Sequence, residues 1–235
     1  MDGRIGRGFR ARFRALAAAS GESDPEGWAA SRVSEAMADG GQPAPPRGLL
    51  AAWERELRSA RARGASGSGA APPWARFDDG RPPRFLCDPS LAGLARWLRA
   101  AGYEAALAPE VPGHRLPDEA LRRGLVLLTT EAETLDRRIV VDGSLVAVWV
   151  PSVLTMAEQL RMAALDLGLA RREPRCMACG GTLVPTPKEA VRPRIPPRTA
   201  LWKDEYSVCA GCGGLFWRGT HWERIEAALR RAVAA

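Results

Sequence analysis

The sequence predicts an α/β fold, in which a parallel sheet lies between helices, with a cysteine-rich unit after it and a helical extension before it. Between residues 84 and 170, short apolar segments alternate with amphipathic ones, as in parallel sheets covered by helices on both faces. The segments LVLL and LVAVWV are continuously apolar, which is typical of strands buried on both sides. Two close cysteine pairs beyond residue 170 indicate a separate small unit.

Three regions are therefore expected along the chain. They are a helical extension at residues 1–75, an α/β domain at 84–170, and a cysteine-rich unit with a C-terminal helix at 171–235. Pro, Gly and Ser are concentrated at residues 38–46 and 64–73, which are typical linkers, and we place a domain boundary at the second.

Within the extension, residues 10–19 and 45–64 are the clearest helices. The second carries an apolar stripe formed by Leu49, Trp53 and Leu57. Such stripes usually serve the core, so we expect it to pack against this chain's own sheet domain, with docking on a partner protein as the alternative. The Arg-rich start favours a plain helix beginning over a transit peptide, because glycines interrupt any long amphipathic face, at Gly3, Gly6 and Gly8.

The α/β domain is predicted element by element from its alternating pattern. Strands are expected at residues 84–88, 103–107, 125–130 and 144–150, and helices at 90–102, 117–123, 131–138 and 153–168. The first helix follows the dipeptide Asp88-Pro89, a strong N-cap and first-turn signal, and Gly102 ends it.

The net charge of +7 is distributed unevenly, with +3 over residues 1–75, −2 over 76–169 and +6 over 170–235. An acidic middle beside a basic tail suits a nuclease, in which carboxylates hold cations and a basic surface attracts phosphates. The alternative is that arginine is merely abundant, as Ala, Gly and Pro also are here. No apolar run reaches the roughly 18 residues of a membrane span, so no membrane partner is expected.

The cysteine-rich unit predicts a structural zinc site. Two CxxC pairs, each followed by two glycines, supply four thiolates, Cys176, Cys179, Cys209 and Cys212, and leave no open position on a tetrahedral ion. The pairs are 29 residues apart, a longer loop than usual. Two redox pairs or unpaired thiols are the alternatives. This cysteine usage fits a reducing compartment, so a cytoplasmic location is expected.

The loop between the cysteine pairs is basic and rich in proline, and we expect the prolines to hold it extended. Its basic groups could follow a phosphate backbone: Lys188, Arg192, Arg194 and Arg198. Aromatic residues lie around it, namely Trp202, Tyr206, Phe216, Trp217 and Trp222, a combination that suits single-stranded nucleic acid. For Trp202 and Trp222, packing of the unit against the sheet domain is the favoured interpretation.

Acidic side chains follow two of the predicted strands. In a parallel sheet, sites form outside the carboxyl ends of the strands. Asp88 ends the first strand and Glu131 follows the third, so together they could hold Mg²⁺ or Mn²⁺ and support phosphodiester hydrolysis. Candidates for a third ligand are Glu133, Asp118 and Glu119. The alternative is capping, with Asp88 as an N-cap and Thr130 to Glu133 as a capping box.

Three segments resemble a known family. FLCDPSLAGLARWLRAAGYEA resembles the opening of the RNase family defined by the carboxy-terminal domain of the Mut-seven exonuclease, and LLTTEAETL resembles its second signature. The tail, with DEY before the second cysteine pair and FWRGTHWERI after it, resembles the zinc ribbon of that family. The resemblance covers about residues 84–226 and implies a PIN-like α/β fold, metal-dependent RNA cleavage and an appended zinc ribbon.

The resemblance also implies roles for single residues. Asp88 matches the first acidic residue of the family, Glu131 stands where the family usually has Asp, and Glu133 matches the next Glu. Arg96 and Arg99 match two helix arginines, which are expected to meet phosphate or brace the carboxylates. The longer Glu131 arm departs from the family pattern, and residues 1–75 lie outside the match.

We therefore expect a ribonuclease that depends on a divalent metal and acts on single-stranded or loop RNA. The expected catalytic residues are Asp88, Glu131, Glu133 and Glu119, and the expected substrate contacts are Arg96, Arg99, Lys188, Arg192 and Arg194. The alternatives are an RNA-binding zinc-ribbon protein with weak catalysis, and a toxin-like or scaffold component that docks on a partner through its N-terminal helices.

Overall fold

The structure is a computed structural model, which describes residues 3–38, 46–63 and 81–233. Its centre is a four-stranded sheet in the order β2-β1-β3-β4, with every neighbouring pair parallel. The strands are β1 (Phe85–Cys87), β2 (Ala105–Leu107), β3 (Val126–Thr129) and β4 (Ala147–Trp149). The predicted parallel α/β sheet is confirmed. Most of residues 38–46, and all of 64–73, lie outside the described residues.

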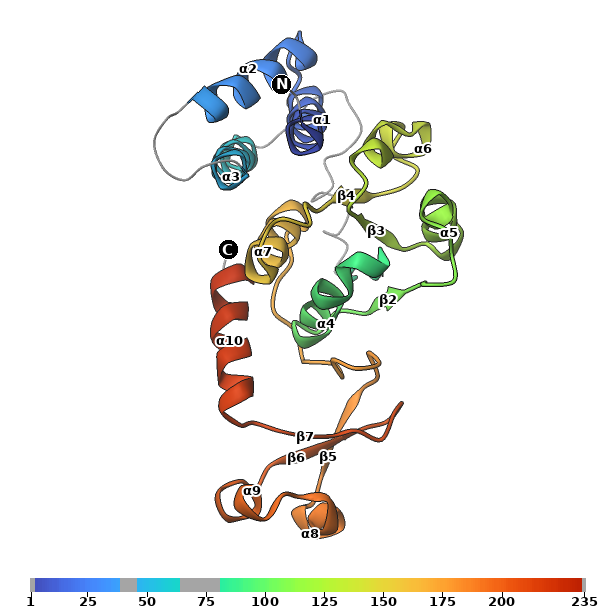
Figure 1. Cartoon of the computed structure of the whole chain (residues 1–235), viewed down its shortest axis with the longest axis vertical. Helices are drawn as coiled ribbons and strands as arrows, with labels where there is room; N and C mark the ends of the chain where they lie inside the picture. The colour runs from blue at the N-terminus through green and yellow to red at the C-terminus, as the bar shows by residue number, and fades with distance from the viewer. Residues whose placement is uncertain (1–2, 39–45, 64–80, 234–235) are drawn as a thin grey trace.

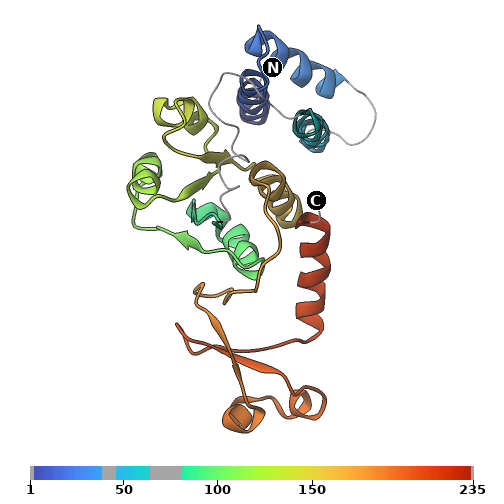
Figure 2. The ribbon, with the colours of Figure 1, turned by 180° about the vertical axis from the view of Figure 1, so that it is seen from behind.

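Helices cover both faces of this sheet (Figures 1 and 2). They are α4 (Ala92–Ala100), α5 (Leu116–Arg123), α6 (Arg138–Val141) and α7 (Met156–Leu167). Side chains of α4 and α7 share one hydrophobic core with Phe85, Cys87, Val126 and Leu128. Residues of α5 and α6 pack on the opposite face, against Leu86 and Leu127. This alternation explains the unbroken apolar runs, because strands of a covered parallel sheet bury both faces.

The predicted helix at 131–138 forms as two pieces instead of one. Residues Ala132–Asp136 make a 3₁₀ turn, η4, and α6 begins only after Arg137. Arg137 has extended backbone angles, φ −67° and ψ 138°, so the chain changes direction there. Two further 3₁₀ turns lie at the starts of helices, η2 (Pro89–Leu91) before α4 and η3 (Gly113–Arg115) before α5.

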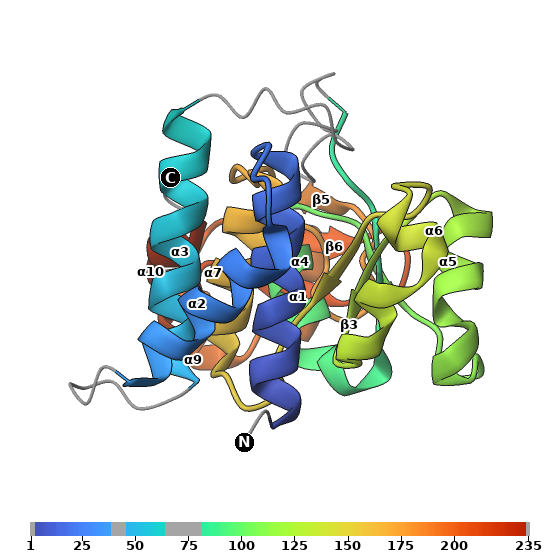
Figure 3. The ribbon, with the colours of Figure 1, turned by 90° about the horizontal axis from the view of Figure 1, so that it is seen from above.

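The N-terminal extension forms three helices, α1 (Arg4–Ala19), α2 (Pro25–Ala38) and α3 (Arg47–Ala62). Figure 3 shows them stacked over α7, and their apolar residues share one cluster with Trp149 of the outer strand β4. Leu49, Trp53 and Leu57 are buried in one cluster with Trp149 and Met162. The apolar stripe therefore packs on this chain's own sheet domain, as the sequence predicted.

A buried polar network joins this extension to the sheet domain. Arg12 of α1 is 5% exposed, donates to the backbone carbonyl of Trp149 at 2.8 Å, and pairs with Asp166 of α7. Trp53 Nε1 of α3 donates to the other Asp166 oxygen at 2.8 Å, and its ring lies under the Arg12 guanidinium. Burying charge is costly unless it is paired and hydrogen-bonded, and here both charges are paired and only the Arg12 Nε donor lacks a partner.

The glycines near the N-terminus do not interrupt α1, contrary to the sequence-based expectation. The helix runs from Arg4 through Gly6 and Gly8, both of which are buried. At Gly8, an added Cβ would lie 2.5 Å from the six-membered ring of Trp149. Gly8 therefore allows α1 to lie directly on that ring, an advantage that offsets the weak helix propensity of glycine.

The C-terminal unit is a three-stranded antiparallel ribbon in the order β5-β6-β7, beneath α4 in Figure 1. The strands are β5 (Leu183–Thr186), β6 (Tyr206–Cys209) and β7 (Leu215–Trp217), and α10 (Thr220–Val233) then returns to pack beside α7. In the part of the chain that the structure describes, no helix is both long and apolar enough to cross a membrane.

The proline-rich loop of the ribbon is folded, so the prediction of an extended loop is wrong. It forms α8 (Lys188–Val191), a 3₁₀ turn η5 (Arg192–Arg194) and α9 (Pro197–Trp202). Pro193 and Pro197 lie in the first turns of η5 and α9, and Pro187 and Pro196 are the N-cap residues of α8 and α9, positions at which the missing N–H costs little. Val191 and Ile195 bury against Tyr206, which gives the loop a small core of its own.

Candidate functional site

Two sheet strands bring the principal acidic residues to one edge. The strand order reverses direction between β1 and β3, and this switch point is where open α/β sheets form their ligand crevice. Asp88 directly follows β1, and its backbone N–H donates to the carbonyl of Leu128 in β3 at 2.8 Å. Thr130 and Glu131 directly follow β3. The expected adjacency of Asp88 and the end of the third strand is thus present.

The Asp88 carboxylate is held by donors on both of its oxygens. Oδ1 accepts from the backbone N–H of Ser90 at 2.9 Å and from the Ser90 hydroxyl. Oδ2 accepts from Thr130 Oγ1 at 3.0 Å and from the Thr130 N–H at 3.5 Å. Burial raises the pKa of Asp88, but the hydrogen bonds from Ser90 and Thr130 outweigh it and bring the pKa below its usual value. Asp88 is therefore an ionised carboxylate at neutral pH.

Asp88 is a helix cap and a strand-end carboxylate at the same time. It is the N-cap of η2, with Pro89 at the first helical position. Its second oxygen reaches across to Thr130, at the end of the neighbouring strand. Capping therefore uses one oxygen and leaves the other directed toward the end of β3, so the two interpretations of this residue do not exclude each other.

A chain of contacts runs from Asp88 to the N-terminal helix. Thr130, which donates to Asp88, has its own carbonyl bound by Trp149 Nε1 at 3.2 Å. The Trp149 ring lies edge-on to Phe9, with centroids 5.4 Å apart, and Gly8 lies against it. Sequence reasoning missed Ser90 and Trp149 here, although a hydroxyl two residues after a capping Asp is a readable signal.

The side chain of Glu131 extends into solvent. Its side chain is exposed, and Oε1 lies 2.9 Å from the position that a Cβ would take on Gly113, at the start of η3. The predicted capping box from Thr130 to Glu133 does not form, because Glu131 is the N-cap residue of η4 and no side chain caps that turn. The Thr130 hydroxyl is used by Asp88 instead.

The other acidic candidates point elsewhere. Glu133 faces α1, where its carboxylate lies 3.9 Å from Arg7. Glu119 is bonded along its own helix, to Arg122 at 2.6 Å. Asp118 lies 3.7 Å from Arg137 and so faces the loop after β3. Among the described residues, neither acid of α5 forms a hydrogen bond or ion pair with Asp88 or Glu131.

The oxygen donors at this edge suit a hard cation. Carboxylates and hydroxyls are the ligands that Mg²⁺ and Mn²⁺ take, with several waters retained. Asp88 supplies a fixed carboxylate, Glu131 a free one, and the Ser90 and Thr130 hydroxyl oxygens lie 3.3 Å apart beside Asp88. Among the described residues, however, three carboxylates do not come within ligand distance of one another. Asp88 and Glu131 thus follow neighbouring strands at this edge, while their carboxylates have different neighbours, Ser90 and Thr130 for Asp88 and Gly113 for Glu131.

The expected substrate contacts divide into free and occupied groups. Arg96 is exposed on α4, and Arg192 is exposed on η5. Arg99 is 7% exposed and donates to the carbonyls of Ala105, Met177 and Ala178. It braces the first cysteine turn against the sheet domain. Two others are engaged within the ribbon, since Lys188 pairs with Asp204 at 2.7 Å and Arg194 donates to the carbonyl of Gly213.

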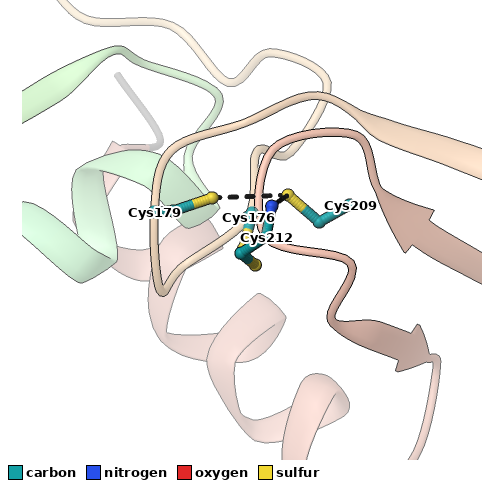
Figure 4. A group of neighbouring side chains, drawn as sticks. All are labelled: Cys176, Cys179, Cys209 and Cys212. Atoms are coloured by element: carbon teal, nitrogen blue, oxygen red, sulfur yellow. Dashed lines mark hydrogen bonds between the residues drawn. The ribbon is translucent and has the colours of Figure 1, made fainter.

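The four predicted zinc ligands come together. Figure 4 shows the side chains of Cys176, Cys179, Cys209 and Cys212 converging from two tight turns. Their sulfurs lie within 4.8 Å of one another, with 3.4 Å between Cys179 and Cys209 and 3.7 Å between Cys176 and Cys212. A tetrahedral zinc site with bonds of about 2.3 Å requires sulfurs about 3.8 Å apart, which these distances approach.

Glycines shape the cysteine site. A Cβ on Gly181 would lie 2.8 Å from the Cys209 sulfur, and the backbone N–H of Gly181 donates to the Cys179 sulfur at 3.4 Å. The Gly211 N–H donates to the Cys209 sulfur at 3.3 Å. Hydrogen bonds favour the thiolate form, and those from the Cys212 N–H, the Cys179 side chain and the Gly211 N–H, in that order, lower the pKa of Cys209 to about 6. The donor set therefore fits a structural metal such as zinc.

Comparison with known proteins agrees with this geometry. The family model of the Mut7-C RNAse domain matches residues 83–229, which include the sheet, Asp88, Glu131 and all four clustered cysteines. No curated protein and no solved structure is similar enough to count as a match. The helices α1–α3 lie outside the matched residues, although they pack directly on them. By the extent of this match, the chain belongs to the Mut7-C RNase domain family.

Proposed function

We propose that this protein is a divalent-metal-dependent ribonuclease that hydrolyses phosphodiesters in single-stranded or loop RNA. The observation that carries the proposal is the Asp88 carboxylate, which stands at the switch point of a parallel sheet within a matched RNase domain. The family supports a nuclease-like activity, and the basic ribbon, with +6 over residues 170–235, supports a polyanionic substrate.

In this proposal Asp88 and Glu131 hold Mg²⁺ or Mn²⁺ at the sheet edge. A bound ion would supply a Lewis acid and an activated water for attack on the phosphodiester. Ser90 and Thr130 keep Asp88 ionised and fixed in direction through their hydrogen bonds. The exposed side chain of Glu131 is free to turn toward the ion, and Arg96 of α4 would meet a phosphate. A cytoplasmic location belongs to the same proposal, supported by five cysteines that form no disulfide.

The test is cleavage of a single-stranded RNA with Mg²⁺ or Mn²⁺, comparing wild type with Asp88→Asn. Asn still accepts from the Ser90 N–H, so the fold is expected to survive while a charged ligand is lost. We expect the rate to fall at least as much as the roughly 10- to 100-fold typical of disturbed metal shells. Asp142→Asn, an exposed acid after α6, is the matched control. Equal cleavage by wild type and Asp88→Asn would exclude the proposal.

One observation favours a second candidate, an RNA-binding zinc-ribbon protein with weak catalysis. Within the described ranges, no three carboxylates lie close enough together to hold one metal ion. This candidate predicts salt-dependent RNA affinity together with no cleavage by wild type in either metal. The cleavage assay therefore separates the two candidates directly.

A further inference from the structure

The tip of the ribbon exposes an unusual pair of apolar side chains. On α9, Leu201 is 76% exposed and Trp202 is 81% exposed, more than any other large hydrophobic residue in the described ranges. The sequence predicted that Trp202 packs the ribbon against the sheet domain, and this is wrong. Trp222 does pack against that domain, in the core of α4 and α7. Ala200 provides the inward contact of α9, so the outer face of the helix has no partner in the fold.

The ribbon does not need Trp202 for its own stability. Its small core is complete without it, because Val191, Ile195 and Tyr206 pack together and the Tyr206 ring lies 6.5 Å from that of Trp217. The solvent-exposed indole of Trp202 has a large apolar face, and contact of that face with another flat group is favourable. A nucleic-acid base is such a group, and every base offers a stacking face.

The charges beside Trp202 indicate which partner is suited. Arg198 lies four residues before Trp202, on the same side of α9, and is exposed with no partner in the described structure. Arg192 on the preceding turn is likewise exposed and unpaired. Three acids lie in residues 188–205 against five basic groups, and one of those acids, Asp204, is engaged by Lys188. The free charges at the tip therefore favour a polyanion.

We propose that this outer face of α9 is a binding surface for single-stranded RNA, in which Trp202 stacks on a base while Arg198 and Arg192 contact phosphates. The inference rests on the proposed function for its ligand and adds a second contact, distant from the acidic edge. Glu131 of that edge leads into η4, which packs against α1, whereas α8 and α9 lie at the opposite end of the molecule from α1–α3 (Figures 1 and 2). The surface therefore binds RNA outside the nucleotide that reacts.

The test measures binding, and so does not depend on cleavage. Zinc-loaded protein without added Mg²⁺ or Mn²⁺ is titrated with a single-stranded oligouridylate of about 30 nucleotides, longer than the roughly 4–16 that one small domain covers. Trp202→Ala is expected to weaken affinity roughly tenfold, within the range for one lost base stack, while Trp202→Phe retains most of it. Arg198→Ala is expected to lower the slope of log affinity against log salt by about 0.7.

Arg231→Ala removes another exposed arginine, from α10, and is the matched control, expected to leave affinity unchanged. All variants should keep the wild-type zinc content and melting temperature, because the mutated side chains are exposed. If Trp202→Ala and Arg198→Ala bind RNA like wild type, the proposal is overturned. It is equally overturned if these variants lose binding to a partner protein while their RNA affinity stays intact. The wild-type protein could also cut no RNA and yet bind RNA with an affinity that depends on Trp202. That result would support the binding surface on α9 and contradict the proposed ribonuclease activity.

Discussion

At the scale of single residues, the acidic edge depends on contacts that extend to the N-terminal helix. Asp88 is bound by Thr130, Thr130 by Trp149, and Trp149 lies against Gly8. Trp149 is 2% exposed and held by Phe9, so its ring has little freedom to move aside. Packing in such a site tolerates added volume poorly.

We therefore predict that Gly8→Ala destabilises the protein, against the usual preference of helices for alanine. Propensity alone would stabilise by about 1 kcal/mol, whereas overpacking against a rigid ring costs about 1–3 kcal/mol. Denaturant unfolding of both proteins measures the free energy of unfolding and so gives the sign of its change. Ala15→Gly, at an exposed position of α1, calibrates propensity on the same helix. A Gly8→Ala variant more stable than wild type would show that the Trp149 ring moves aside for the added methyl group.

At the scale of elements, α1–α3 are attached to the sheet domain by both apolar and charged contacts. The Arg12–Asp166 pair lies at the centre of that junction, with Arg12 5% and Asp166 4% exposed. The Trp53 indole donates to Asp166 and the Trp149 carbonyl accepts from Arg12, whereas the buried Arg12 Nε has no hydrogen-bond partner. Breaking a buried pair by removing one charge is far more costly than replacing both partners with apolar groups.

Asp166→Asn is accordingly expected to destabilise the protein by about 3–5 kcal/mol, because it leaves the Arg12 charge buried and unpaired. The double variant Arg12→Met with Asp166→Leu should be closer to wild type than Asp166→Asn, since it removes both charges. Chemical denaturation of the three proteins provides the comparison. A loss below about 1 kcal/mol for Asp166→Asn would indicate that water reaches this junction.

At the scale of the whole molecule, the ribbon is joined to the sheet domain on two sides. Arg99 of α4 donates to carbonyls of the first cysteine turn, and α10 returns from the ribbon to pack beside α7. Loss of metal or of a ligand at the cysteine site should therefore also destabilise the core of the sheet domain. A metal that binds only the folded state also adds its binding free energy to stability.

Removal of zinc by a chelator, or Cys176→Ser, is expected to lower the melting temperature of the entire chain by several degrees, in one transition. Circular dichroism at a helical wavelength follows α4 and α7 as well as the ribbon, and metal analysis gives the zinc content. Re-addition of zinc should restore the chelated wild type and not Cys176→Ser. An unchanged melting temperature after complete chelation would show that zinc does not stabilise the fold.

Much of this architecture was predictable because it depends on local patterns. Strand ends, the Asp88 cap and the spacing of Cys176 and Cys179 are readable from neighbouring residues. The arrangement of Arg12, Gly8 and Trp202 was not, because their surroundings come from elements far apart in the chain or from solvent. The carbonyl contacts of Arg99 were not predictable for the same reason, since the carbonyls of Met177 and Ala178 come near it only in the fold.

The central claim is that Asp88 and Glu131 hold a catalytic divalent metal at the carboxyl ends of β1 and β3. Its most direct test is an anomalous difference map from a crystal soaked in Mn²⁺. We predict a peak bonded to an Asp88 oxygen at about 2.2 Å, with Glu131 turned toward it, and no such peak in Asp88→Asn. Manganese found only at exposed acids away from the sheet edge, in a crystal whose cysteine site still holds zinc, would contradict the claim.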